Sequence, residues 1–189
     1  MKGWLAIGAL VLSGACGEAV ASEDRAVALE DLGGRSHAPL EVPADMRHVV
    51  VFTTIDCPIA NAYAPELRAI ARDHAPEVRL FLVHVDATLE VEDLRRHGEE
   101  YGYGDEVVLL RDPDHVLVER LGATITPEAF VLEADGSVAY RGRIDDHFGG
   151  VGKKRPAPTR RDLRLALEEL ARGEPVTVTA TEPVGCFIE

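Results

Sequence analysis

One cysteine of this chain stands where a buried strand meets a helix, a position that can make a thiol reactive. Residues 49–52 form a short apolar run typical of a core strand. Cys57 follows, and Pro58 suits the first turn of a helix, where its missing N–H needs no partner. Unpaired amides and the dipole at a helix start favour negative charge. We therefore expect Cys57 to act as a nucleophilic thiolate. The alternative is a small core residue without chemistry.

A disulfide cycle needs a second thiol, and Cys186 is the only internal candidate. The segment from Gly173 to Cys186 can extend over roughly 45 Å, enough to reach almost any point of a domain of this size. We predict a reversible bond between Cys57 and Cys186. A permanent structural disulfide, and pairing of Cys186 with another subunit or protein, are the alternatives.

The N-terminus predicts export from the cytoplasm. Residues 1–21 contain one lysine, an apolar run and then small residues, as in a signal peptide. Cleavage after Ala21 and a lipoprotein signal that ends before a lipidated Cys16 are both open. In either case the expected location is extracytoplasmic: periplasmic, secreted or lipid-anchored. Membrane anchoring is expected only through Cys16.

The net charge of the chain is strongly acidic, apart from one basic segment. The formal net charge is −13 at pH 7, which argues against nucleic-acid binding. Residues 153–164 are nevertheless rich in lysine and arginine. The segment is either a solvated loop that leads into a helix or a docking surface for an acidic partner.

The remaining pattern predicts the elements that position Cys57. Strands and helices alternate in the order βαβα, a short strand and helix, then ββα, which implies a central mixed sheet flanked by helices. Residues 22–44 form a lead-in, 45–172 the domain and 173–189 an extended tail. The expected strands are 47–54, 78–87, 106–110 and a hairpin within 127–144. The expected helices are 57–73, 89–101, 113–122 and 159–172.

Local signals refine these elements. Pro65 should kink the helix that follows Cys57. Asp112 is a candidate cap of a helix that starts at Pro113. The dipeptide 135–136, Asp-Gly, predicts a type I′ hairpin turn. Thr159, with an acidic residue at 162, predicts a capped start for the last helix.

Over residues 45–172 the chain resembles the thioredoxin superfamily. Cys57 after the first core strand, Pro65 eight residues later and Thr126-Pro127 before the hairpin stand where that family has its reactive cysteine, a kinking proline and a cis-proline. The resemblance implies an α/β, thioredoxin-like fold. It also implies that the N–H and C=O of Thr126 lie open beside Cys57 and orient a bound thiol or peptide. An ordinary edge-strand proline is the alternative for Pro127.

Within the superfamily, the chain looks most similar to secreted redoxins of the AhpC/TSA-like group, on the segments DCPIAN, TPEAFVLEADG, YRGRIDD and VGC. The second cysteine of the thioredoxin C-x-x-C motif is missing. Thr54 and Cys57 supply the T-x-x-C of peroxiredoxins, but Val50 replaces their proline. Pro127 stands where we align their peroxide-polarising arginine. Arg111, Arg141 and Arg143 are candidate substitutes for that arginine.

The resulting hypothesis is a thiol–disulfide oxidoreductase with Cys57 as nucleophile, Cys186 or an external thiol resolving, and Thr126-Pro127 orienting the substrate. A peroxiredoxin-like peroxidase is one alternative. A copper-binding or protein-docking module is another, with Cys57, Cys186 and His84 or His147 as ligands. The expected partners are a protein or small molecule that contains a thiol or disulfide, and an external thiol reductant. No cofactor is expected.

Overall fold

A computed structural model describes residues 27–189, and the predictions for the signal peptide, Cys16 and the start of the lead-in lie outside this range. The strands are β1 (Leu29–Glu30), β2 (Ser36–His37), β3 (Arg47–Thr53), β4 (Val78–His84), β5 (Val107–Arg111), β6 (Ile125–Thr126), β7 (Glu128–Leu132), β8 (Val138–Gly142), β9 (Phe148–Gly150), β10 (Lys153–Lys154) and β11 (Cys186–Phe187). The helices are α1 (Pro58–Ala62), α2 (Ala64–Asp73), α3 (Val91–Tyr101), α4 (Val116–Leu121) and α5 (Asp162–Ala171).

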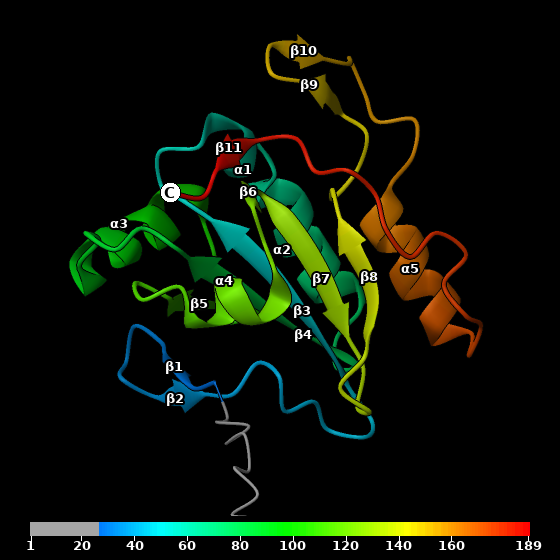
Figure 1. The fold of residues 1–189 in the computed structure, drawn as a ribbon, viewed down its shortest axis with the longest axis horizontal. Coiled ribbons are helices and arrows are strands. Elements are labelled where there is room, and N and C mark those ends of the chain that lie inside the picture. Colours follow the sequence, from blue (N-terminus) through cyan, green and yellow to red (C-terminus); the bar gives the residue numbers. More distant parts are fainter. Residues whose placement is uncertain (1–26) are drawn as a thin grey trace, which may run out of the picture.

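Five strands form the central sheet, in the order β5-β4-β3-β7-β8 (Figure 1). β3 pairs in parallel with β4 and antiparallel with β7, so the sheet is mixed, as predicted. Three two-stranded pairings flank it: β1 with β2, β9 with β10, and β6 with β11. The last of these joins the C-terminal tail to the segment before Pro127.

Alternate residues of β3 face opposite sides of the sheet and belong to two separate cores. Val49 and Val51 pack in one core with apolar residues of α1, α2 and α5. Val50 and Phe52 pack in the other with residues of α4 and of the N-terminal hairpin. The strand is therefore covered on both faces, which explains why its sequence is continuously apolar rather than alternating.

The helix after Cys57 is broken, as the proline predicted. α1 ends at Ala62, and α2 starts at Ala64 with Pro65 in its first turn. Tyr63 joins the two helices and is buried, with its N–H donated to the carbonyl of Ala60. The break lets one apolar stripe, which also includes Leu67, follow the curved face of the sheet.

Asp112 caps α4 from further away than the sequence indicated. The helix begins at Val116, not at Pro113. The Asp112 carboxylate accepts the N–H groups of Val116, Leu117 and Val118 at 2.8–2.9 Å. One buried carboxylate thus satisfies three amides that the helix start leaves without partners.

Two local predictions were wrong. The hairpin between β7 and β8 does not turn through a type I′ pair, because only Gly136 of the Asp-Gly dipeptide has a positive φ, at 82°. Thr159 does not cap α5, whose N-cap is Arg161, and the Arg161 side chain makes no capping bond to the helix. The Thr159 hydroxyl instead donates to the carboxylate of Asp146. The hairpin instead uses a turn with one left-handed residue, Gly136, and the Thr159 hydroxyl is taken up by Asp146.

The tail after α5 crosses the sheet edge and ends beside the start of α1 (Figure 1). Arg141 of β8 exchanges backbone hydrogen bonds with Thr179 and Thr181, at 2.9 and 3.0 Å. β11 then pairs antiparallel with β6, with Cys186 opposite Thr126. Among residues 27–189, no helix is long and apolar enough to cross a membrane.

Candidate functional site

Cys57 is the N-cap of α1, as its place in the sequence predicted. Its Sγ accepts the N–H of Ala60 at 3.5 Å, and its own N–H donates to the carbonyl of Thr54 at 3.4 Å. Thr54 thus contributes its backbone to this turn, and neighbouring Asp56 is exposed. Cys57 itself is only 1% exposed. The sulfur therefore has a helix-start donor but almost no solvent.

The peptide bond between Thr126 and Pro127 is cis, as predicted, and it lies against Cys57. The thiol of Cys57 donates to the carbonyl of Thr126 across 3.2 Å. The prediction that the Thr126 backbone lies open was wrong. Thr126 is fully buried, because β11 occupies the edge of β6. A residue of the chain's own tail stands where a bound peptide was expected.

Cys186 places its sulfur directly on that of Cys57. Both cysteines are free thiols, and the two Sγ atoms are 2.8 Å apart, with Cys186 donating. Burial, together with the hydrogen bond and charge of Cys57, raises the pKa of the Cys186 thiol to about 11. Cys186 therefore stays protonated at neutral pH. The two cysteines that we expected to pair are therefore in contact, and the pairing of the tail strand β11 with β6 brings them together.

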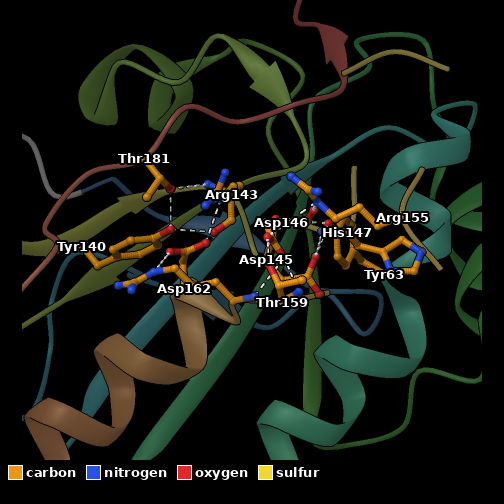
Figure 2. Close-up of polar contacts among 11 residues, drawn as sticks. Tyr63, Tyr140, Arg143, Asp145, Asp146, His147, Arg155, Thr159, Asp162 and Thr181 are labelled. Atoms are coloured by element: carbon orange, nitrogen blue, oxygen red, sulfur yellow. Dashed lines mark hydrogen bonds and ion pairs between the residues drawn. The ribbon is translucent and has the colours of Figure 1, made fainter. Parts of the chain in front are cut away.

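A polar corner at the end of β8 anchors the tail (Figure 2). The Tyr140 hydroxyl donates to the carbonyl of Arg143 at 2.6 Å and lies 2.6 Å from the hydroxyl of Thr181. The Arg143 N–H donates to Thr181 at 3.1 Å, and its guanidinium pairs with buried Asp162 at 2.7 Å. Thr181 thus bonds two residues of the corner, five positions before Cys186.

The same corner continues toward α1 through two further carboxylates (Figure 2). The Tyr63 hydroxyl donates to Asp145 at 2.6 Å, and burial with this carboxylate raises the pKa of Tyr63 far above its usual value. Hydrogen bonds from Thr159 lower the pKa of Asp146, which also pairs with Arg155 at 3.6 Å. The corner therefore joins the helix break, the tail and the loop before α5.

Most of the basic segment 153–164 is neutralised within the chain. Arg164 pairs with Glu66 at 2.6 Å and with Asp73 at 2.8 Å, and Arg161 pairs with Glu66 at 3.1 Å. Arg160 pairs with Asp162 at 2.5 Å. These pairs support the reading of a structural loop over that of a docking surface.

A chain of hydrogen bonds connects the Cys57 loop to α3, and sequence reasoning missed it. Asn61 Nδ2 donates to the carbonyl of Ile55 at 2.7 Å, and its Oδ1 faces His97 Nε2 at 2.9 Å. His97 Nδ1 faces His84 Nε2 at 3.1 Å. Because the Asn61 oxygen is an acceptor, His97 Nε2 donates to it; with both rings neutral, His97 Nδ1 then accepts from His84 Nε2.

Burial supports that protonation state. It lowers the pKa of His84 to about 3, with the neighbouring His97 ring adding to the effect, and it lowers the pKa of His97. Asn61 and His84 could each be noticed in the sequence, but His97 lies on a helix that carries no motif. Only the packing of α3 against the carboxyl ends of the strands unites the three.

The arginines considered for a peroxide site are not at the sulfur. Arg141 pairs with Glu128 at 2.9 Å, and Arg143 is held by Asp162. Arg111 ends β5, which β4 separates from β3. Within residues 27–189, the hydrogen-bond partners of Cys57 Sγ are a carbonyl, an amide and a thiol. A cation that would polarise a peroxide is not among them.

The copper alternative also lacks ligands in the described part of the chain. No three histidine, cysteine or carboxylate side chains between residues 27 and 189 gather closely enough to hold a metal ion. His84, one of the histidines considered, bonds His97 instead of facing the thiols.

Comparison with known proteins addresses the fold. A scan of protein-family models gave no match, and a search of curated proteins gave none. Among solved structures, an uncharacterized conserved protein from Geobacillus kaustophilus is 25% identical with a TM-score of 0.75, covering 86% of this chain and 87% of that one. A hypothetical protein from Sinorhizobium meliloti 1021 is 26% identical with a TM-score of 0.73, covering 86% and 89%.

A further match carries a functional description of its own. A secreted Mycobacterium tuberculosis disulfide oxidoreductase homologous to E. coli DsbE is 20% identical with a TM-score of 0.56, covering 77% of this chain and 96% of that one. The structural neighbours include thioredoxin-like proteins, and the present chain has the thioredoxin-like fold, as predicted.

Proposed function

We propose that this protein is an extracytoplasmic thiol–disulfide oxidoreductase whose redox pair is Cys57 and Cys186. One observation carries the proposal: the two Sγ atoms lie 2.8 Å apart, at the N-cap of α1 and beside Pro127. In place of a C-x-x-C motif, the tail delivers the second sulfur from the far end of the chain. The disulfide oxidoreductases among the structural neighbours support this class of reaction.

The reaction exchanges two electrons. When the two thiols form a disulfide, they lose two protons and two electrons, and these pass to a substrate disulfide, which becomes a dithiol. In the opposite direction a substrate dithiol is oxidised and the protein disulfide is reduced. The substrate class is therefore a protein or small molecule that contains a disulfide or a pair of thiols. An external thiol couple restores the starting state.

A redox titration tests the proposal. The protein is equilibrated in glutathione buffers of graded potential, quenched in acid and analysed by mass spectrometry without reduction. We expect a reversible two-electron transition between the dithiol and a Cys57–Cys186 disulfide. A midpoint below about −300 mV would instead indicate a structural disulfide, and thiols that stay reduced throughout would refute the pair.

Catalysis is measured separately, as the rate at which the protein oxidises or reduces a model peptide with two cysteines. Cys57→Ser and Cys186→Ser should each abolish turnover. Circular dichroism of both variants checks that the fold is kept. Turnover that survives either substitution contradicts the assignment.

A further inference from the structure

We infer that external thiols attack the disulfide at Cys186, so that the mixed disulfide with a partner forms on the tail and Cys57 is the leaving group. The inference rests on the proposed function, because it requires a Cys57–Cys186 disulfide. It differs from the expectation drawn from the sequence, in which Cys57 meets the substrate.

The first argument is access. In thiol–disulfide exchange the entering sulfur approaches along the line of the bond that breaks, from the side opposite the leaving sulfur. For attack at Cys57, that line enters protein, because the residue is 1% exposed and packs in the core with Ile59 and Ala60. Cys186 is only partly buried, so part of its surface is open to an entering thiol. Of the two sulfurs, the one on the tail is therefore the more accessible to an entering thiol.

The second argument is the leaving group. Exchange is faster when the departing thiol leaves readily as an anion. When the bond breaks, Cys57 departs beside the Ala60 N–H, which donates to its sulfur at the start of α1. Burial, the largest cause of the raised pKa of Cys186, disfavours its departure as a thiolate. Departure of Cys57 is therefore favoured, and it is the same outcome that access dictates.

The atoms balance in two steps. A substrate thiolate attacks Cys186 Sγ, the Cys57–Cys186 bond breaks, and Cys57 leaves as a thiolate. The second thiolate of the substrate then attacks the substrate sulfur of the mixed disulfide, and Cys186 leaves and takes a proton. The substrate becomes a disulfide, and the protein becomes a dithiol with two more electrons. In reverse, Cys57 is the internal nucleophile that releases the partner from Cys186.

The surroundings of Cys186 indicate the kind of partner that can reach its sulfur. β11 is two residues long, and Phe187, directly after Cys186, is 78% exposed. The tail around Cys186 is therefore at the surface, where a partner thiol can approach it. An exposed thiol on a peptide or on a small molecule fits this approach, whereas a thiol within a folded core does not.

A trapping experiment identifies the attacked sulfur. Wild-type protein carrying the Cys57–Cys186 disulfide receives a brief pulse of glutathione, then excess N-ethylmaleimide at the same pH, and is mapped by peptide mass spectrometry. We expect glutathione on Cys186 and maleimide on Cys57, with at least about a tenfold excess over the opposite arrangement. Cys186→Ser, which cannot form the disulfide, is the matched control and should acquire no glutathione.

The other outcomes contradict either this inference alone or the inference together with the proposed function. Glutathione on Cys57 with maleimide on Cys186, or equal amounts of both products, overturns the inference and leaves the redox pair intact. If oxidation never produces a Cys57–Cys186 disulfide, the starting material cannot be made, and both the inference and the proposed function fail.

Discussion

Gly185 lies against the carbonyl of Thr126 so closely that a Cβ at residue 185 would come within 1.9 Å of the carbonyl oxygen. The same Cβ would lie 3.1 Å from Cδ of Pro127. Glycine is needed here for the close approach of two backbones. This contact places the next residue, Cys186, on the sulfur of Cys57.

Gly185→Ala is therefore expected to displace the end of the tail while leaving the core intact. With β11 gone, Cys57 becomes accessible, and its alkylation by N-ethylmaleimide in the reduced protein should accelerate by about tenfold or more. Formation of the Cys57–Cys186 disulfide should slow in parallel. Acid quenching at timed intervals, followed by peptide mass spectrometry, measures the rate of alkylation and the rate of disulfide formation.

Gly149→Ala is the matched control for this variant. A Cβ at Gly149 would meet only the carbonyl of Lys153 at 3.9 Å, an ordinary contact. Its alkylation rate should equal that of the wild type. If Gly185→Ala also behaves like the wild type, the tail does not shield Cys57.

Oxidation of the pair should stabilise the fold. A Cys57–Cys186 disulfide closes a loop over most of the domain, which the chain-entropy description values at roughly 4–5 kcal/mol. Urea unfolding of the oxidised and reduced wild type should differ by about this amount. Cys186→Ser should unfold at the same urea concentration with and without oxidant. Equal stability of both wild-type forms would contradict the predicted gain.

The sequence was informative where the signals are local. The apolar run of β3, Cys57 with Pro58, and the kink at Pro65 depend on neighbouring residues, and all three were predicted. The cis bond before Pro127 followed from a family resemblance and is also present.

The sequence was uninformative where contacts join distant segments. Nothing near Cys186 indicates that it pairs with Thr126, because a two-residue strand carries no periodicity and the partner lies 60 residues away. The close approach of Gly185 depends on that same pairing. The histidine chain likewise depends on the position of α3. In the basic segment 153–164, Arg161 and Arg164 looked free because their acidic partners, Glu66 and Asp73, lie on α2.

Acid should weaken the protein through the buried histidines before it protonates the carboxylates. The pKa of His84 is lowered from 6.5 to about 3, and that of His97 is also lowered. In the unfolded chain both bind a proton below about pH 6.5, whereas the folded chain keeps them neutral. The free energy of unfolding should therefore fall as pH drops from 6.5 toward 3, by the order of a few kcal/mol for His84.

His84→Leu isolates this contribution, because His48 and His74, whose pKa values are also lowered by burial, remain in the variant. Urea midpoints from pH 7.5 to 4.5 should decline less steeply in His84→Leu than in the wild type. Parallel curves would show that His84 does not stay neutral in the folded state.

Thr181→Val tests whether the corner at β8 holds the tail that carries Cys186. Tyr140 donates its proton to the carbonyl of Arg143, so the Thr181 hydroxyl donates to Tyr140 while accepting the Arg143 N–H. Valine keeps the shape of threonine but leaves that N–H and the Tyr140 oxygen without their partner. The expected loss is about 1–3 kcal/mol of unfolding free energy.

Thr181→Ser keeps the hydroxyl and should stay within about 0.5 kcal/mol of the wild type. The two variants should also differ in the rate of disulfide formation. Thr181 lies five residues before Cys186 and bonds to Tyr140 and Arg143, so it can affect that rate only through the position of the tail. If the anchor positions the tail, Thr181→Val slows formation of the Cys57–Cys186 disulfide and Thr181→Ser does not. Disulfide formation at the wild-type rate in a destabilised Thr181→Val would show that the pairing of β11 with β6 alone brings the sulfurs together.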